Sequence, residues 1–240
     1  MQVNGKTVLV TGGTDGIGLE IARQLLAKGG AAVIVCGRRE EMLATARIEG
    51  LEAIAADLST ANGCFAFLDA LDARLLDVLI NNAGMSGNFG PDEPIDLPLA
   101  DQAIFLNLNA PMHLIARLLP ALLTRPEAAI VNVTSGLAIA PRAGGPVYCA
   151  TKAGLRSFTQ ALRHNLRNTK VHVIEALPPV VDTAMTAGRD ARKMSPKECA
   201  SQIIDAIENN KPEANVGMVK LLQIMHSISP ALARRIMIKF

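Results

Sequence analysis

The chain has 240 residues, of which 50% are hydrophobic and 19% are charged, and its formal net charge is +2. This composition predicts a folded protein with a large aliphatic core and excludes a disordered chain. The sequence has no block of Lys or Arg that would indicate nucleic-acid binding, and no run of about 18 apolar residues that would predict a membrane-spanning helix.

Short β-rich apolar runs alternate with segments of helical periodicity. Strands are predicted at Thr7–Thr11, Ala31–Gly37, Leu51–Ala56, Val78–Asn81, Ala129–Thr134 and Val171–Ala176. Helices are predicted at Ile17–Lys28, in a charged segment ending near Glu49, and at Cys64–Asp72, Ala100–Leu123, Val147–Arg167 and Pro196–Asn209. This alternation predicts one α/β domain over residues 1–240, with a doubly wound parallel sheet of about seven strands and helices on both faces.

Two segments interrupt this pattern. Residues 85–98 are rich in Gly and Pro, which predicts a loop. Pro111 falls within the helical segment Ala100–Leu123 and should either kink that helix or set its start.

The C-terminal segment, residues 218–240, is atypical. A short last strand is predicted at Asn215–Lys220, and Ser229-Pro230 should divide the residues that follow into two short helices. The segment is apolar and has no acidic residue; its basic residues are Lys220, Arg234, Arg235 and Lys239. It could be a substrate lid or subunit contact, which we prefer, a basic amphipathic helix at a membrane surface, or a part packed onto the domain.

The thiols and imidazoles show no metal-site spacing. The four cysteines form no CxxC pair and the four histidines are scattered, so we expect neither a disulfide framework nor a bound metal. Residues Met1 to Lys6 lack a signal-peptide pattern. These features predict a cytoplasmic protein whose thiols are reduced.

A glycine-rich turn joins the first predicted strand to the first predicted helix, between Thr11 and Gly18. Its first glycine permits a tight turn, and the later ones let the backbone approach a pyrophosphate and the helix pack on the strand. Backbone N–H groups at the helix start would face the phosphates. The turn predicts a dinucleotide site, although a plain strand–helix turn is the alternative.

The second predicted strand ends at Gly37, followed by Arg38 and Arg39. An acidic residue there would bind the adenosine ribose and select NAD, whereas Arg38 could bind a 2′-phosphate. We therefore predict NADP in preference to NAD, with NAD possible. Asp15 complicates the prediction because a carboxylate close to a 2′-phosphate would repel it, and the two arginines could simply begin a solvated helix.

Tyr148, the chain's one tyrosine, and Lys152 stand four residues apart at the start of a predicted helix and so share a face. A nearby ammonium favours the phenolate and lowers the pKa of a tyrosine toward the range useful for proton transfer. Ser135 follows the fifth predicted strand, where its hydroxyl could hold a substrate oxygen. Taken singly, a YxxxK match and a Ser-Gly turn are common coincidences.

Polar residues also follow the third and fourth predicted strands. Asp57 could accept a hydrogen bond from an adenine amine, and Asn81 to Gly84 could line the cofactor cleft. Each alone is more often local turn chemistry. Their joint placement at the carboxyl ends of successive strands favours a cofactor site.

These motifs together resemble the short-chain dehydrogenase/reductase family. Thr11–Gly18 is similar to the family's TGxxxGxG turn, Asn81–Gly84 to its NNAG motif, and Ser135, Tyr148 and Lys152 fall at its Ser–Tyr–Lys spacing. The resemblance spans roughly residues 5–210. It implies a single-domain Rossmann fold, a homodimer or homotetramer, and hydride transfer between nicotinamide and a carbonyl or alcohol carbon.

The resemblance also assigns further residues. Asn107 matches the family's fourth catalytic residue and would hold a water through which Lys152 relays protons, with Asn109 as a nearby competitor. Pro178-Pro179 departs from the usual Pro-Gly. Segments around Ser135 and Tyr148 look closest to the bacterial reductases named after the lipoteichoic-acid D-alanylation operon. The predicted cofactor-binding residues are Thr11, Gly12, Thr14, Asp15, Gly16, Ile17, Gly18, Arg38, Arg39, Asp57, Leu58, Asn82, Ala83, Gly84, Tyr148, Lys152, Val181 and Thr183.

The leading hypothesis is therefore an NAD(P)-dependent oxidoreductase acting on a small-molecule carbonyl or alcohol, with Tyr148 as general acid and base. Residues 85–98, 136–146 and 184–200 should shape the substrate pocket, and 184–200 is expected to be a lid. The alternatives are a non-catalytic cofactor-binding or scaffolding protein and a redox-neutral epimerase or dehydratase.

Overall fold

The computed structural model describes residues 1–72, 74–86, 95–188 and 192–239. Seven strands form one parallel sheet in the order β3-β2-β1-β4-β5-β6-β7. Their bounds are β1 Thr7–Thr11, β2 Ala32–Gly37, β3 Glu52–Ala55, β4 Val78–Asn81, β5 Ala128–Val133, β6 Val171–Leu177 and β7 Glu213–Asn215. The predicted doubly wound parallel sheet is confirmed.

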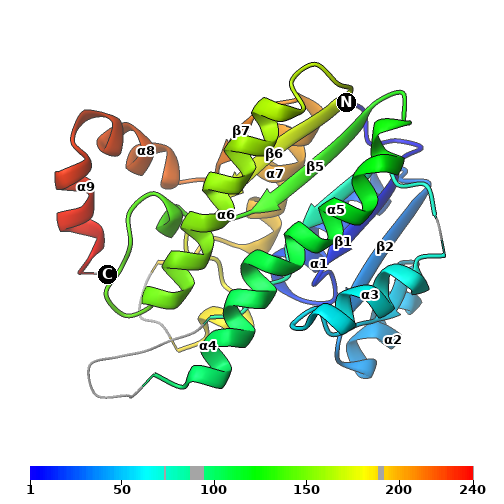
Figure 1. The fold of residues 1–240 in the computed structure, drawn as a ribbon, viewed down its shortest axis with the longest axis horizontal. Helices are drawn as coiled ribbons and strands as arrows, with labels where there is room; N and C mark the ends of the chain where they lie inside the picture. The colour runs from blue at the N-terminus through cyan, green and yellow to red at the C-terminus, as the bar shows by residue number, and fades with distance from the viewer. Residues whose placement is uncertain (73, 87–94, 189–191, 240) are drawn as a thin grey trace.

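The central strands are buried on both faces, as their continuous aliphatic runs predict. All six residues of β5 and all four of β4 are buried. Figure 1 shows α3 (Ala61–Ala70), α5 (Ala110–Leu123) and α6 (Pro146–Asn165) over one face, with α1 (Gly16–Ala27) and α7 (Pro196–Glu208) behind the other. Two separate hydrophobic clusters, one on each face, hold these layers together.

Most helices begin at a residue that caps them. Asp15, Thr60, Asp96 and Ser195 each accept a hydrogen bond from a backbone N–H of the first turn of α1, α3, α4 (Leu97–Ile104) and α7. Such caps satisfy N–H groups that have no partner within the helix. The charged segment predicted to end near Glu49 is α2, Glu40–Ile48.

The predicted helix Ala100–Leu123 is two helices. α4 and α5 are joined by a π-helical turn, Phe105–Asn109, directly before Pro111 in the first turn of α5. Proline has no N–H, so the carbonyl of Asn107 has no donor four residues on and the helical pattern is broken there. Of the loop predicted at 85–98, residues 87–94 lie outside the described part of the chain, and 97–98 begin α4.

The last strand was predicted wrongly at Asn215–Lys220. β7 ends at Asn215, and Gly217 adopts a left-handed backbone with φ +54°, after which α8 (Val219–Ile228) begins. Ser229 caps α9 (Pro230–Met237), so the predicted division into two short helices is confirmed. Within the described residues, no helix is both long and apolar enough to cross a bilayer.

Candidate functional site

A cavity of about 570 Å³ opens at the carboxyl ends of the strands, where the order changes direction between β1 and β4. Open α/β sheets bind ligands at such a switch point. Fifteen of the eighteen residues predicted to bind cofactor line it: Gly12, Thr14, Asp15, Gly16, Ile17, Arg38, Arg39, Asp57, Leu58, Asn82, Ala83, Gly84, Tyr148, Lys152 and Thr183.

The glycine-rich turn forms the floor of the cavity. Gly12 and Gly16 adopt left-handed backbones, with φ +61° and +53°, which side chains disfavour. A Cβ at Gly18 would lie 2.3 Å from Asn82 Nδ2 and 2.4 Å from the Gly12 carbonyl oxygen. The backbone thus forms a cradle at the start of α1, which fits the pyrophosphate of a dinucleotide.

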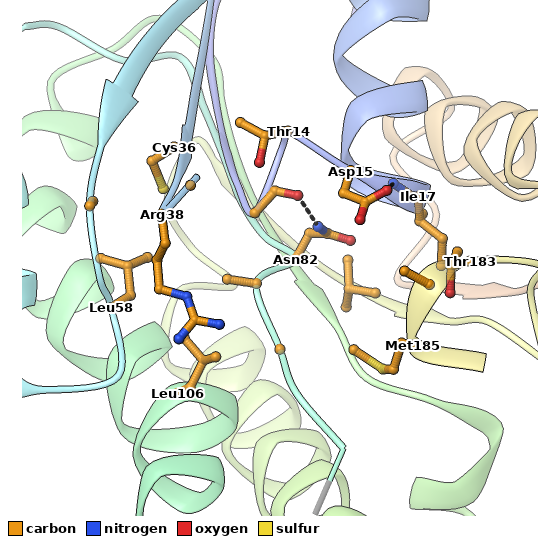
Figure 2. Close-up of a pocket in the computed structure, with 18 of the residues that line it drawn as sticks. Thr14, Asp15, Ile17, Cys36, Arg38, Leu58, Asn82, Leu106, Thr183 and Met185 are labelled. Carbon is orange, nitrogen blue, oxygen red and sulfur yellow. Dashed lines mark hydrogen bonds between the residues drawn. The ribbon is translucent and has the colours of Figure 1, made fainter. Parts of the chain in front are cut away.

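Thr11 and Asn82 tie this turn to the end of β4. Asn82 Nδ2 donates to the carbonyls of Thr11 and Gly12, at 3.0 and 3.2 Å, and Figure 2 shows this side chain lying against the turn. Thr11 Oγ1 accepts from the N–H groups of Asn82 and Ala83, both at 3.0 Å. Thr11 and Gly18 do not line the cavity, and both act behind its wall.

The end of β2 has no room for an acidic side chain. A Cβ at Gly37 would lie 2.4 Å from Thr14 Oγ1. Arg38 extends along the cavity beside Leu58 (Figure 2). Arg39 Nη2 bonds Asp15 Oδ2 at 3.0 Å, so the carboxylate that argued against NADP already has a cationic partner.

Asp57 also lies in the cavity wall, after β3. Its Oδ1 accepts the N–H of Ser59 at 3.0 Å, which fixes the loop and orients the carboxylate. The other oxygen remains able to accept from a ligand amine, as the sequence predicts.

Lys152 lies at the opposite end of the cavity, and its side chain is buried. Its Nζ donates to the Val133 carbonyl oxygen at 2.9 Å and lies 5.7 Å from the centre of the Tyr148 ring. Burial lowers the pKa of the Lys152 ammonium to about 8, because desolvation disfavours its charge. The structure therefore brings the predicted pair together within the cleft.

Ser135 is placed just outside the cavity lining. It directly follows Thr134, which does line the cavity. Its Oγ accepts the Leu137 N–H at 3.1 Å, and the residue is 8% exposed. In this bond the hydroxyl oxygen is the acceptor. The hydroxyl proton can therefore still be donated to a carbonyl oxygen.

Asn107 is buried behind the same end of the cavity. Its side-chain Oδ1 accepts the Met85 N–H and its Nδ2 donates to the Met85 carbonyl, both at 2.9 Å. Nδ2 also donates to Thr151 Oγ1 at 3.1 Å. A Cβ at Gly84 would lie 3.1 Å from Asn107 Oδ1 and 3.5 Å from Lys152 Nζ. Gly84, Asn107 and Lys152 thus meet at one point.

Thr134 is fixed by a buried charge network that the sequence analysis missed. Its Oγ1 donates to Glu175 Oε1 at 2.7 Å, and Arg156 bonds the other oxygen of Glu175 at 2.7 Å. Glu175 is fully buried, and desolvation raises the pKa of its carboxyl against the opposing effects of Thr134 and Arg156. Arg156 also bonds Glu213 on β7.

The segment after β6 closes one side of the cavity. Thr183 and Met185 line it, whereas Val181 is buried in the core and accepts the Thr186 hydroxyl at 2.5 Å. Of the predicted lid 184–200, residues 184–186 form a 3-10 turn, 189–191 lie outside the described residues, and 196–200 begin α7.

Nine lining residues are not among the predicted cofactor-binding residues. Ala184 and Met185 belong to the predicted substrate segment 184–200, most of the others stand at or just beyond a strand's carboxyl end, and Leu106 has no such signal. They are Cys36, Gly37, Ala56, Leu106, Val133, Thr134, Pro178, Ala184 and Met185.

The chain resembles known proteins over most of its length. Residues 6–194 match the short chain dehydrogenase family. The chain is 41% identical to an uncharacterized oxidoreductase, DltE, of Bacillus subtilis, over 89% of this chain and 88% of that protein, and 35% identical to the ketoacyl reductase HetN of Nostoc, over 98% and 88%. Among solved structures, it superposes on a Burkholderia cenocepacia short chain dehydrogenase in complex with NADP, with a TM-score of 0.88, 25% identity and full coverage of both chains. The chain therefore belongs to the short-chain dehydrogenase family of oxidoreductases.

Proposed function

We propose that this protein reduces a small carbonyl compound, or oxidises the corresponding alcohol, with Tyr148 as general acid and base. The observation that carries the proposal is the buried Lys152 ammonium, which lies 5.7 Å from the Tyr148 ring centre in the cleft that the glycine-rich turn also lines. Its charge favours the phenolate and so brings the phenol toward the pKa that proton transfer needs.

The chain's own residues would do the acid–base work, while a bound nicotinamide dinucleotide supplies or accepts the hydride. Ser135 Oγ–H would hold the substrate oxygen, and the Tyr148 hydroxyl would donate the proton to it. The Val133 carbonyl holds Lys152 Nζ in place beside the ring. Two hydrogen-bond donors at one oxygen stabilise the charge that develops there during reduction.

Asn107 would serve the proton relay through its backbone. Its amide is committed to Met85 and Thr151, whereas its carbonyl has no donor four residues on because residue 111 is proline. That carbonyl is the group we assign to the predicted water between Lys152 and solvent.

A cofactor titration followed by a substrate panel tests the proposal. We expect NADPH fluorescence to change on binding, and at least one member of a carbonyl panel to drive NADPH oxidation with release of NADP⁺. Binding without turnover on the whole panel would instead favour a non-catalytic protein. Turnover with no free oxidised cofactor would favour an epimerase or dehydratase.

We further propose that the enzyme prefers NADP to NAD, because Arg38 lines the cavity, Gly37 leaves no space for an acid, and Arg39 pairs Asp15. Replacing Arg38 with Ala should lower the ratio of kcat/KM for NADPH to that for NADH by about 10- to 150-fold, because a charge-assisted hydrogen bond contributes about 1.5–3 kcal/mol. Arg167→Ala, which removes an exposed bond to the His164 carbonyl away from the cavity, is the control and should leave the ratio unchanged. An unchanged ratio in Arg38→Ala as well would remove Arg38 from cofactor selection.

We also propose a cytoplasmic homodimer or homotetramer in which the part of the predicted lid that precedes α7 covers the cavity, since Cys199 and Ala200 are buried in the core. The four cysteines are all buried free thiols, which supports a cytoplasmic location because thiols stay reduced there. Family membership supports the oligomer, and the position of Ala184 and Met185 in the cavity wall supports the lid.

A further inference from the structure

We propose that α8 and α9 form a peripheral docking surface for an anionic lipid bilayer. We call this surface the C-terminal face. It includes exposed apolar and basic side chains of the two helices, among them Leu221, Ile224, Ile228 and Leu232 with Arg234, Arg235 and Lys239.

The apolar residues of α8 form a stripe that points into solvent. Leu221, Ile224 and Ile228 follow one another at intervals of three and four residues, which places them on one side of the helix. They are 57%, 57% and 81% exposed. A surface helix normally directs such a stripe toward the core, so this one is available to an apolar partner outside the chain.

Packing within the domain does not account for the stripe, because the opposite side of the helix pair already meets the body. Leu222 and Ala233 are buried against Ala140, and the Ala143 N–H bonds the Ile238 carbonyl at 3.1 Å. Figure 1 shows the pair beyond α6 and away from the sheet. In the described chain, no residue of 218–239 lines the cavity, although Val219 and Leu222 lie against Gly136, so the inner side of α8 borders the segment predicted to shape the substrate pocket.

The positive charge of the C-terminal face indicates an anionic partner. Residues 218–240 contain Lys and Arg but no Asp or Glu. Arg234, Arg235 and Lys239 form no salt bridge within the described residues, whereas Lys220 lies near Asp205. Two copies of such a face would bring like charges together, which disfavours symmetric self-association through it. A basic, apolar face matches a surface of anionic headgroups over hydrocarbon.

The helix lengths set the depth of contact. α8 has 10 residues and α9 has 8, or about 15 and 12 Å at the usual helical rise, far below the thickness of a hydrocarbon core. The helices would therefore lie in the plane of the bilayer, with the stripe of α8 at the boundary between the headgroups and the acyl chains.

Vesicle co-flotation of the full chain tests the proposal. We expect binding to vesicles of phosphatidylcholine with phosphatidylglycerol, weak or no binding to phosphatidylcholine alone, and weaker binding at high salt. Arg234→Gln with Arg235→Gln should lower the partition coefficient by about 25-fold, at about fivefold for each basic residue near the surface. Ile224→Ser with Ile228→Ser should lower it by at least about tenfold.

Matched controls come from exposed residues elsewhere on the body. Ile48, on α2, is 87% exposed, and Lys170 and Lys197 are exposed cations. Ile48→Ser and the pair Lys170→Gln with Lys197→Gln should leave vesicle binding within about twofold. All variants should bind NADPH as the wild type does, which shows that they are folded and separates this test from that of the catalytic proposal.

Two results would overturn the proposal. One is equal or absent binding to both vesicle types by the wild type. The other is sedimentation velocity in which Ile224→Ser with Ile228→Ser dissociates an oligomer while vesicle binding is unchanged, because the C-terminal face would then be a subunit contact.

Discussion

Replacing Tyr148 with phenylalanine should lower kcat by about 10²- to 10⁴-fold, the usual contribution of a positioned general acid. The affinity for NADPH should remain within about twofold, because the ring keeps its place above Lys152 and loses only its hydroxyl. Single-turnover kinetics with a reactive carbonyl and fluorescence titration of NADPH measure the two quantities separately.

The composition of the chain offers a second readout. The protein has one tyrosine and no tryptophan. Near-ultraviolet absorbance during a pH titration therefore reports the ionisation of Tyr148 alone. In Lys152→Met, which removes the neighbouring cation, the phenol should ionise at higher pH than in the wild type. Full turnover in Tyr148→Phe, or the same titration midpoint in both proteins, would contradict the assigned acid–base role.

Breaking the buried ion pair behind the candidate active site should produce the largest loss of stability. Arg156→Met removes the cation that bonds Glu175, whose side chain is fully buried. An uncompensated buried charge destabilises a fold by about 3–5 kcal/mol. Urea unfolding at neutral pH should show this loss in the free energy of unfolding.

The loss of stability in Arg156→Met should become smaller as the pH is lowered. Burial raises the pKa of the Glu175 carboxyl in the folded protein above its unfolded value. The carboxyl therefore disfavours folding above the folded pKa, where it is charged, and ceases to do so below the unfolded pKa. The destabilisation should shrink as the pH is lowered through that window, and Glu175→Gln in the Arg156→Met background should recover part of it at neutral pH.

An exposed pair provides the control. Lys28 bonds Glu208 on the surface, with side chains 45% and 24% exposed, and surface pairs contribute about 0–1 kcal/mol. Lys28→Met should therefore change the free energy of unfolding little. If Arg156→Met lowered the free energy of unfolding no more than Lys28→Met does, the ion pair between Arg156 and Glu175 would not stabilise the fold as its burial indicates.

Much of the site follows from the chain's local pattern. The aliphatic runs of β1, β4 and β5 could form only a sheet buried on both faces, and parallel strands collect their carboxyl ends at one edge. The glycines of the turn and the four-residue spacing of Tyr148 and Lys152 are local properties of a strand–helix junction and of a helix. For that reason most of the lining of the cavity could be predicted residue by residue.

The interactions that complete the site join residues far apart in the chain. Arg39 neutralises Asp15 across 24 residues, Asn107 meets Met85 across 22, and Arg156 reaches Glu175 from α6 to β6. The outward direction of Leu221, Ile224 and Ile228 likewise depends on which side of α8 meets Ala140. Amino-acid order sets the period of each element and the chemistry of each turn, because both arise from neighbours along the backbone. Which charges pair and which apolar face stays in water are settled by contacts between elements, and these exist only once the sheet and its helices have packed.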